Sequence, residues 1–403
     1  MSVSVADVLL DDDIVDRIMT FCSTFDTLRS TVLVSKAFYR IFQAHPKATY
    51  NIVGPALPQA LRVIRYPYHE YTLDSLIAAA CPEEPHPDVI PAEEEALLEN
   101  SRVVAALEDV YSRTNKDNKS RTSVLSSEES WRFRRAMYRI MLYCKLFPHD
   151  RYENDEILDM DDERVDKIRK QRTATLDDYP TDELRELWSV LKFLVDIFNR
   201  VSVSEPNMIS ALLSTGPSGA LRAWEARAYD VLEEDIDIMF LYEEDDDPIL
   251  FQGYFSIPFQ NIWTSRNTSP PKADDSASKW ILDQVISAND TCSQCGAPGG
   301  LGLYTEANWD RLPITNLTSL LRNNLKANPI IINHFSGSTP HLLISDALGP
   351  FIGDLFALKT RTAPEFDNWE RTGSYCWPCL NKFLEANTGY GCEYWIWVRI
   401  LEI

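Results

Sequence analysis

The stretch at residues 184–198 reads Leu184-Arg-Glu-Leu187-Trp188-Ser-Val-Leu191-Lys-Phe-Leu194-Val-Asp-Ile-Phe198. Its leucine and aromatic side chains return every three or four residues, which is the period of one face of an α-helix. A helix with such a face buries one side against its neighbours. The stretch therefore predicts a long amphipathic helix in a helical domain.

The same period recurs towards the N-terminus, and the pattern stays helical up to about residue 245. Two further stripes are Leu97, Val104, Leu107 and Tyr111, and then Phe133, Met137, Ile140, Met141 and Cys144. Beyond residue 248 the sequence pattern changes from helical to mixed, because 329–335 and 394–403 are rich in Ile, Val and Trp and predict strands. We expect a mostly α protein divided into residues 8–46, a helical body at 47–247, and a mixed α+β region at 248–403.

Composition limits the possible partners. The chain has 403 residues, with 39 Lys and Arg against 61 Asp and Glu, so its net charge is −22. Such a charge repels nucleic acid and anionic membrane surfaces. The first ten residues lack the basic and apolar regions of a signal peptide, and no apolar run is long enough to span a membrane. We therefore expect a cytoplasmic or nuclear protein whose cysteines are thiols or metal ligands.

The N-terminal segment 8–46 predicts three short helices. Ile14, Ile18, Phe21 and Cys22 are spaced as on one helical face, behind a run of three aspartates that suits a helix N-terminus. A unit this small has too little core to bury all its apolar residues. We expect part of its surface to lie against another protein or domain.

This segment resembles the F-box, and Asp11 stands where the F-box pattern usually has proline. The matching positions are Leu10, Ile14, Ile18, Phe21, Cys22, Leu28, Val34, Ser35, Lys36 and Phe38. The resemblance implies that these residues dock a Skp-family adaptor, which links the chain to a cullin-RING ubiquitin ligase and brings a bound protein substrate to it. The alternative is an ordinary amphipathic three-helix unit, although core packing does not require the polar Ser35 and Lys36.

Two CxxC units carry the second candidate site. Cys292 and Cys295 are followed by Gly296, and Cys376 and Cys379 come 80 residues later. Each CxxC turn places two thiolates on one side of a tight loop, so that two such turns can form a four-cysteine structural zinc site. Unrelated buried thiols and a redox dithiol at Cys376-Trp-Pro-Cys379 remain open alternatives.

The other cysteines and one histidine have different expected roles. Cys392 and His334 are spare metal ligands, whereas Cys22, Cys81 and Cys144 lie on apolar helical faces and are expected in the core.

No catalytic signature is present, since the sequence contains no HExxH, GxSxG, P-loop or GxGxxG. We therefore expect a non-enzymatic substrate receptor of a ubiquitin ligase, with an unidentified protein substrate bound by residues 249–403. The rival interpretations are a zinc-stapled scaffold protein outside any ligase and a thiol oxidoreductase.

Overall fold

The computed structural model of the chain is mostly helical, as the sequence predicts. It describes residues 12–22, 25–44, 54–66, 83, 91–201, 206–241, 249–269, 271, 277–309, 312, 352–353, 356 and 368–395.

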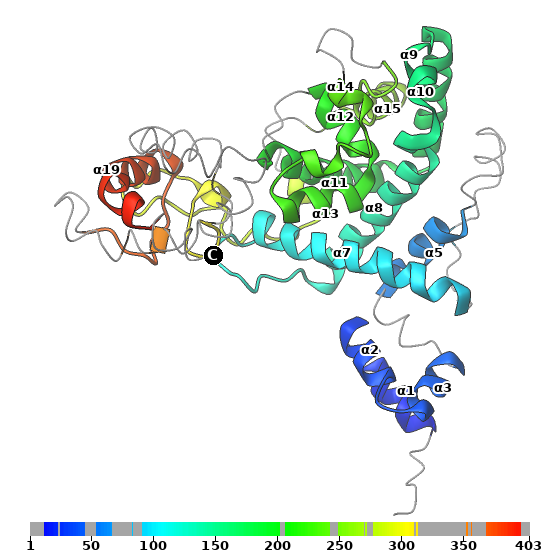
Figure 1. The fold of residues 1–403 in the computed structure, drawn as a ribbon, viewed down its shortest axis with the longest axis horizontal. Coiled ribbons are helices and arrows are strands. Elements are labelled where there is room, and N and C mark those ends of the chain that lie inside the picture. The colour runs from blue at the N-terminus through cyan, green and yellow to red at the C-terminus, as the bar shows by residue number, and fades with distance from the viewer. Residues whose placement is uncertain are drawn as a thin grey trace, which may run out of the picture.

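The α-helices in these residues are α1 (Asp12–Thr20), α2 (Phe25–Val32), α3 (Lys36–Ala44), α5 (Leu57–Arg65), α7 (Glu94–Asn115), α8 (Ser127–Leu146), α9 (Asn154–Leu158), α10 (Asp162–Asp177), α11 (Thr181–Arg200), α12 (Pro206–Ser214), α13 (Gly216–Ala226), α14 (Ile238–Leu241), α15 (Ser256–Ser265) and α19 (Trp377–Trp395). The 3-10 turns are η1 (Gly54–Ala56), η2 (Pro91–Glu93), η3 (His149–Arg151), η4 (Asp230–Leu232), η6 (Ala277–Trp280) and η7 (Gly300–Gly302). Figure 1 shows α1–α3 at one end of the molecule, the helices α5–α15 in the middle, and α19 at another end.

Helix α8 lies at the centre of the body, where it packs against α5, α7, α11 and α13. Its start is fixed by a capping box, in which the Ser126 hydroxyl accepts from Glu129 N and the Glu129 carboxylate accepts from Ser126 N. The three predicted apolar stripes fall on α7, α8 and α11. Of their members only Trp188 is not fully buried, and it packs against the core. The periodicity therefore predicted these three helices correctly.

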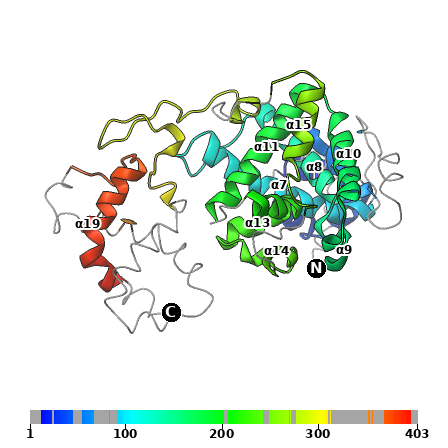
Figure 2. The same ribbon diagram turned by 90° about the horizontal axis from the view of Figure 1, so that it is seen from above.

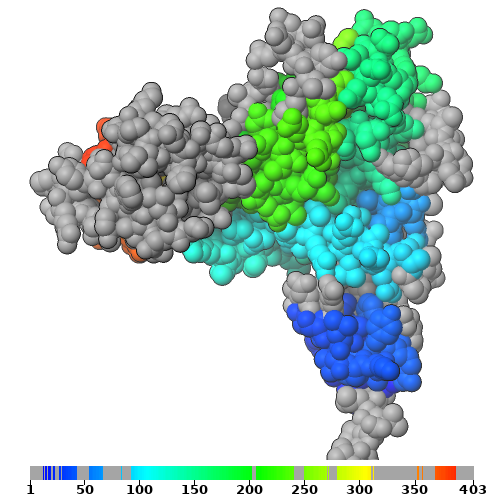
Figure 3. Space-filling model, viewed as in Figure 1, coloured from blue at the N-terminus to red at the C-terminus, as the bar shows by residue number. Residues whose placement is uncertain are grey.

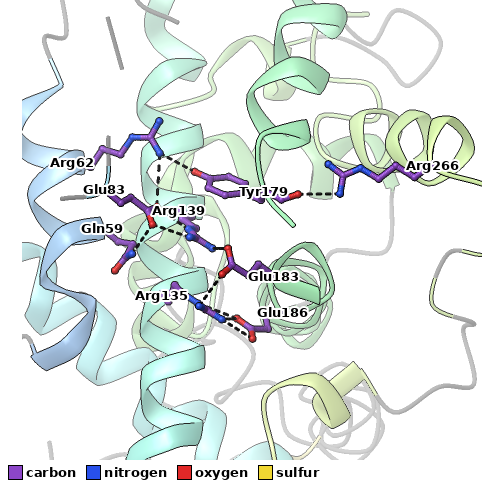
Figure 4. A network of polar contacts seen from close by, with 9 residues as sticks. All are labelled: Gln59, Arg62, Glu83, Arg135, Arg139, Tyr179, Glu183, Glu186 and Arg266. Atoms are coloured by element: carbon purple, nitrogen blue, oxygen red, sulfur yellow. Dashed lines mark hydrogen bonds and ion pairs between the residues drawn. The ribbon is translucent and has the colours of Figure 1, made fainter. Parts of the chain in front are cut away.

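A polar network ties α5, α8 and α11 together beside this apolar core (Figure 4). Arg139 donates to Glu83 at 2.9 and 2.8 Å and to Glu183 at 2.7 Å, while Arg135 forms a forked pair with Glu186. The side chains of Arg135 and Arg139 are only 11% and 6% exposed. Gln59 on α5 joins the network by donating to Glu83 at 2.6 Å. Buried charges are tolerated when they are paired and hydrogen-bonded, so these contacts fix how the three helices meet.

The body's core continues past residue 248. Leu250, Tyr254, Phe259 and Trp263 are buried in the same hydrophobic cluster as α8 and α11, and the cluster ends at Leu282. Helix α15 packs along α10, because its apolar side chains complete the face that α10 and α11 leave open. The packing thus places the boundary of the first hydrophobic core after Leu282, whereas the sequence pattern predicted a domain boundary at residue 248.

Strand structure in the described residues consists of two isolated bridges, Thr291 with Pro298 and Tyr304 with Tyr375. The predicted strand at 329–335 lies outside the described residues, as do 396–403 of the second predicted strand. Its first two residues, Tyr394 and Trp395, belong instead to α19. None of the described helices is long and apolar enough to cross a membrane.

Candidate functional site

Four cysteine thiols from two distant parts of the chain converge on one point. The sulfurs of Cys292, Cys295, Cys376 and Cys379 all lie within 4.8 Å of one another, and those of Cys295 and Cys376 are 3.7 Å apart. Tetrahedral ligands at a Zn–S distance of about 2.3 Å are separated by roughly 3.8 Å. The cluster can therefore hold a metal ion with little movement.

The first pair lies on a tight turn of the kind that the spacing predicts. Gly296 N donates to Cys292 O at 2.9 Å, and Cys292 N donates to Ala297 O at 2.8 Å. Gly296 has a φ of +69°, a conformation that glycine adopts without the clash a side chain would cause. The turn points both thiols to the same side.

The second pair lies at the start of α19. Cys379 N and Leu380 N both donate to Cys376 O, at 3.1 and 3.0 Å, so the chain turns into the helix directly after Cys376. The positive end of the helix dipole favours thiolate charge at this position, but burial and the neighbouring thiols outweigh it in the metal-free chain and raise the pKa of both cysteines.

Backbone hydrogen bonds hold the two pairs together. Tyr304 and Tyr375 exchange N–H···O bonds of 2.8 and 2.9 Å, and Ser293 N donates to Ser374 O at 2.7 Å. Beneath them is a second aromatic core, in which the rings of Trp369 and Tyr375 stack with centroids 4.3 Å apart. The site is thus built on a small folded module and does not depend on the metal alone.

The four thiols have different electrostatic environments. Burial raises the pKa of Cys292, but the N–H groups of Cys295, Cys376 and Gln294 outweigh it and lower that pKa to about 6. Burial raises the pKa of Cys376, and burial together with the neighbouring thiols raises the pKa of Cys379. Because a coordinated thiol is deprotonated, metal binding here would release protons.

The cysteine module is fastened to the helical body through the loop after α7. The buried Asn118 side chain donates to the carbonyls of Leu301 and Leu303 at 3.1 and 2.9 Å, and the Asn118 backbone carbonyl accepts from the Thr305 hydroxyl and from the Asn308 side-chain amide. Ile286 N adds a bond to Lys116 O at 2.8 Å. These contacts hold the Cys292 side of the module against the body.

The residues of the F-box resemblance separate into exposed and buried groups. Ile14, Ile18 and Phe21 are 50%, 43% and 78% exposed, and Val34 is 71% exposed. Ser35 and Lys36 are also exposed, whereas Cys22 and Leu28 are buried in the core of α1–α3. Leu10 lies outside the described residues.

Phe38 corrects one expectation. A docking surface was expected to include it, but it is only 9% exposed because it packs inward between the three helices. Its hydrophobic spacing is shared by surface and core positions, so the sequence pattern could not separate the two.

Two residues with structural roles gave no sequence signal. Asn118, which holds the cysteine module against the body, and Glu83, which pairs with Arg139 in the body, belong to no motif because their roles depend on contacts with distant segments. Of the spare ligands, His334 lies outside the described residues and the side chain of Cys392 is not described. Cys81 also lies outside them, while Cys144 is buried as expected.

Comparison of the chain with protein-family models, with curated proteins and with solved structures gave no significant match. Functional assignment therefore depends on the two sites themselves.

Proposed function

We propose that the chain is an F-box-type substrate receptor that docks a Skp-family adaptor through α1–α3 and so joins a cullin-RING ubiquitin ligase. The observation that carries the proposal is the apolar surface of α1–α3. Among the described residues, six of the eleven exposed large hydrophobic side chains lie between residues 14 and 39: Ile14, Ile18, Phe21, Leu33, Val34 and Tyr39. Exposed apolar patches of this kind mark protein interaction sites.

The small core of α1–α3 explains why this surface stays outside. Val15, Met19 and Ile41 fill the interior, and Ile14 and Ile18 are one helical turn apart on the neighbouring, exposed face of α1, about 100° further around the helix. Three helices of eight or nine residues cannot enclose both sets. The exposed apolar side chains of α1–α3 therefore favour binding to another protein, and the F-box resemblance implies that this protein is a Skp-family adaptor.

The test is adaptor binding by the full-length chain. Ile18→Asp together with Phe21→Asp should reduce the affinity for a purified Skp-family adaptor at least tenfold, because each change puts a charge into an apolar interface. Val124→Asp is the control, since Val124 is 74% exposed and lies outside α1–α3. Far-UV circular dichroism should be unchanged for all variants. Unaltered adaptor binding by the double variant, or no binding by the wild-type chain, would refute the proposal.

We further propose that the metal of the four-cysteine cluster is a structural zinc ion. Four thiolates in tetrahedral arrangement are a common structural zinc set. Elemental analysis should find about one zinc per chain, which Cys295→Ser and Cys379→Ser should remove. Cys22→Ser should keep it, because Cys22 lies in the core of α1–α3. A chain without bound metal after purification in zinc-containing buffer would refute the assignment.

Two other functions compete with the ligase proposal. A zinc-stapled scaffold would share the metal site but would not bind the adaptor. A thiol oxidoreductase is less supported for two reasons. Disulfide exchange needs only two thiols, whereas all four converge on one point here. The described residues before Cys376 form an isolated β-bridge and no strand. Insulin reduction that is lost on Cys376→Ser would favour the oxidoreductase over both.

A further inference from the structure

A groove lies between the three-helix unit and the first turns of α7. It has a volume of about 650 Å³, and its walls come from α2, α3 and the turn between them on one side and from α7 on the other. Figures 1 and 3 show α1–α3 projecting from the body beside the start of α7. The docking residues Ile14, Ile18 and Phe21 do not line it. The groove therefore adjoins the proposed adaptor surface and shares Leu28, Leu33 and Tyr39 with it, while the acidic side chains of α7 belong to the groove alone.

The groove combines an apolar floor with an acidic rim. Leu33, Tyr39 and Leu98 contribute apolar surface, and Leu33 is 72% exposed. Three carboxylates from α7, those of Glu94, Glu95 and Glu99, stand along the opposite side. Arg102 is the single basic side chain among the lining residues, so the negative charge of the rim exceeds the positive charge.

The rim carboxylates lack cationic partners within the described residues. No ion pair there involves Glu94, Glu95 or Glu99, whereas the neighbouring Glu93 is paired with Arg65 at 2.7 Å. One carboxylate oxygen of Glu94 is buried without a hydrogen bond. A buried, unpaired carboxylate is costly, and a cation placed beside it would recover that cost.

We propose that this groove binds a basic amphipathic helix of a partner protein. Helices dock in such grooves by their apolar face, with anchors at intervals of three and four residues. Glu95 and Glu99 are one helical turn apart, about 6 Å along α7, which matches Lys or Arg residues one turn apart on the occupant. The charge of the rim excludes acidic segments and sets the preference for a basic one.

The inference does not depend on adaptor docking. Its test uses the full-length chain and a fluorescein-labelled synthetic helix of about 18 residues, with leucine on one face and lysine on the other. A second peptide carries glutamate in place of lysine. We expect saturable binding of the lysine peptide by fluorescence anisotropy in about 0.15 M salt, and at least tenfold weaker binding of the glutamate peptide.

Matched variants locate the binding. The first variant should lower the affinity for the lysine peptide about tenfold or more; it combines Glu94→Gln, Glu95→Gln and Glu99→Gln. The control combines Glu128→Gln, Asp162→Asn and Glu163→Gln, which lie in the first turns of α8 and α10 and change the net charge equally. It should alter affinity less than about twofold. Equal losses in both sets would mean attraction to the whole acidic chain and would overturn the inference.

A second pair of variants tests the apolar floor. Leu33→Ser should weaken the peptide several-fold, whereas Val124→Ser, at a comparably exposed position, should not. Ile18→Asp should leave peptide affinity unchanged. If the triple groove variant releases the Skp-family adaptor but leaves peptide binding intact, the groove belongs to the adaptor surface and the inference fails, while adaptor docking stands.

Discussion

Gly296 shows how one backbone angle supports the cysteine cluster. An added Cβ at Gly296 would meet nothing within 4 Å, so the cost of a side chain there comes only from its φ of +69°. Gly296→Ala should therefore cost about 1 kcal/mol and weaken metal binding by the cysteine cluster roughly fivefold, measured with the proposed zinc ion by competition with a chelator. Gly302→Ala is the control, because Gly302 is equally open and has no positive φ. Equal effects of the two changes would contradict this explanation.

Glu83 shows how a single carboxylate makes stability depend on pH. Burial raises the pKa of Glu83, but hydrogen bonds from Arg139 and Gln59 and the charge of Arg62 outweigh it and lower that pKa below its usual value. Its stabilising contribution is therefore present above the unfolded pKa of about 4.3 and is lost as pH falls through the lower folded pKa.

The expected consequence is a stability difference that shrinks in acid. At pH 7, Glu83→Gln should lower the free energy of unfolding by about 2 kcal/mol, because Arg139 loses a charged partner. Urea titrations at decreasing pH should show the wild type approaching the variant below about pH 4. The exposed Glu128→Gln should stay within about 0.5 kcal/mol of wild type throughout. If the difference in unfolding free energy between wild type and Glu83→Gln did not change with pH, the lowered pKa of Glu83 would be contradicted.

At the scale of elements, α8 organises the body and its first turn has several roles. The Glu129 carboxylate completes the capping box, pairs with Lys116 and accepts from Asp283 N, which belongs to the segment leading to the cysteine module. Burial raises the pKa of Glu129, but these partners outweigh it and lower that pKa. One helix start therefore connects the body with the approach to the module.

The cap gives an element-scale prediction. Ser126→Ala removes the hydroxyl that accepts from Glu129 N at 3.3 Å and should lower stability by about 1 kcal/mol in urea denaturation. Ser127→Ala is the matched control, because Ser127 is an exposed helical residue where alanine is favourable. A loss of similar size for both serines would show that the cap is not responsible.

At the scale of the whole molecule, two hydrophobic cores divide the chain. The first runs from Val15 to Leu282, and the second lies beneath the cysteines. Figure 2 shows α19 set apart from α8, α11 and α13, as Figure 1 does. This division into two cores predicts where the chain can be truncated without loss of the first core.

A chain ending at residue 290 should stay soluble and melt cooperatively, since it keeps α15 and the contacts of Asp283 and Ile286. A chain ending at residue 248 should aggregate or lose cooperative melting, because it exposes the α10 and α11 surface that α15 covers. Differential scanning calorimetry of both chains checks this. Cooperative melting of the shorter chain would place the boundary at residue 248 after all.

Local sequence was sufficient to predict the long helices and the two cysteine turns, although it wrongly assigned Tyr394 and Trp395 of α19 to a strand. The periodic apolar residues of α7, α8 and α11 predicted helices because a helix repeats its faces within one stretch of chain. Each CxxC pair likewise predicted its own turn, since two thiols three residues apart share one side of a tight loop. Three short helices at 12–44 followed from the same local spacing.

How these elements meet depends on tertiary packing. The packing brings Cys292 and Cys376 together across the long segment between them. It buries Phe38 while Ile14 and Ile18 stay exposed, and it places Glu83 beside Arg139. These outcomes depend on contacts between residues far apart in the chain. Helical period and motif spacing describe neighbours along the chain, so they cannot state which faces pack together or what lies between them.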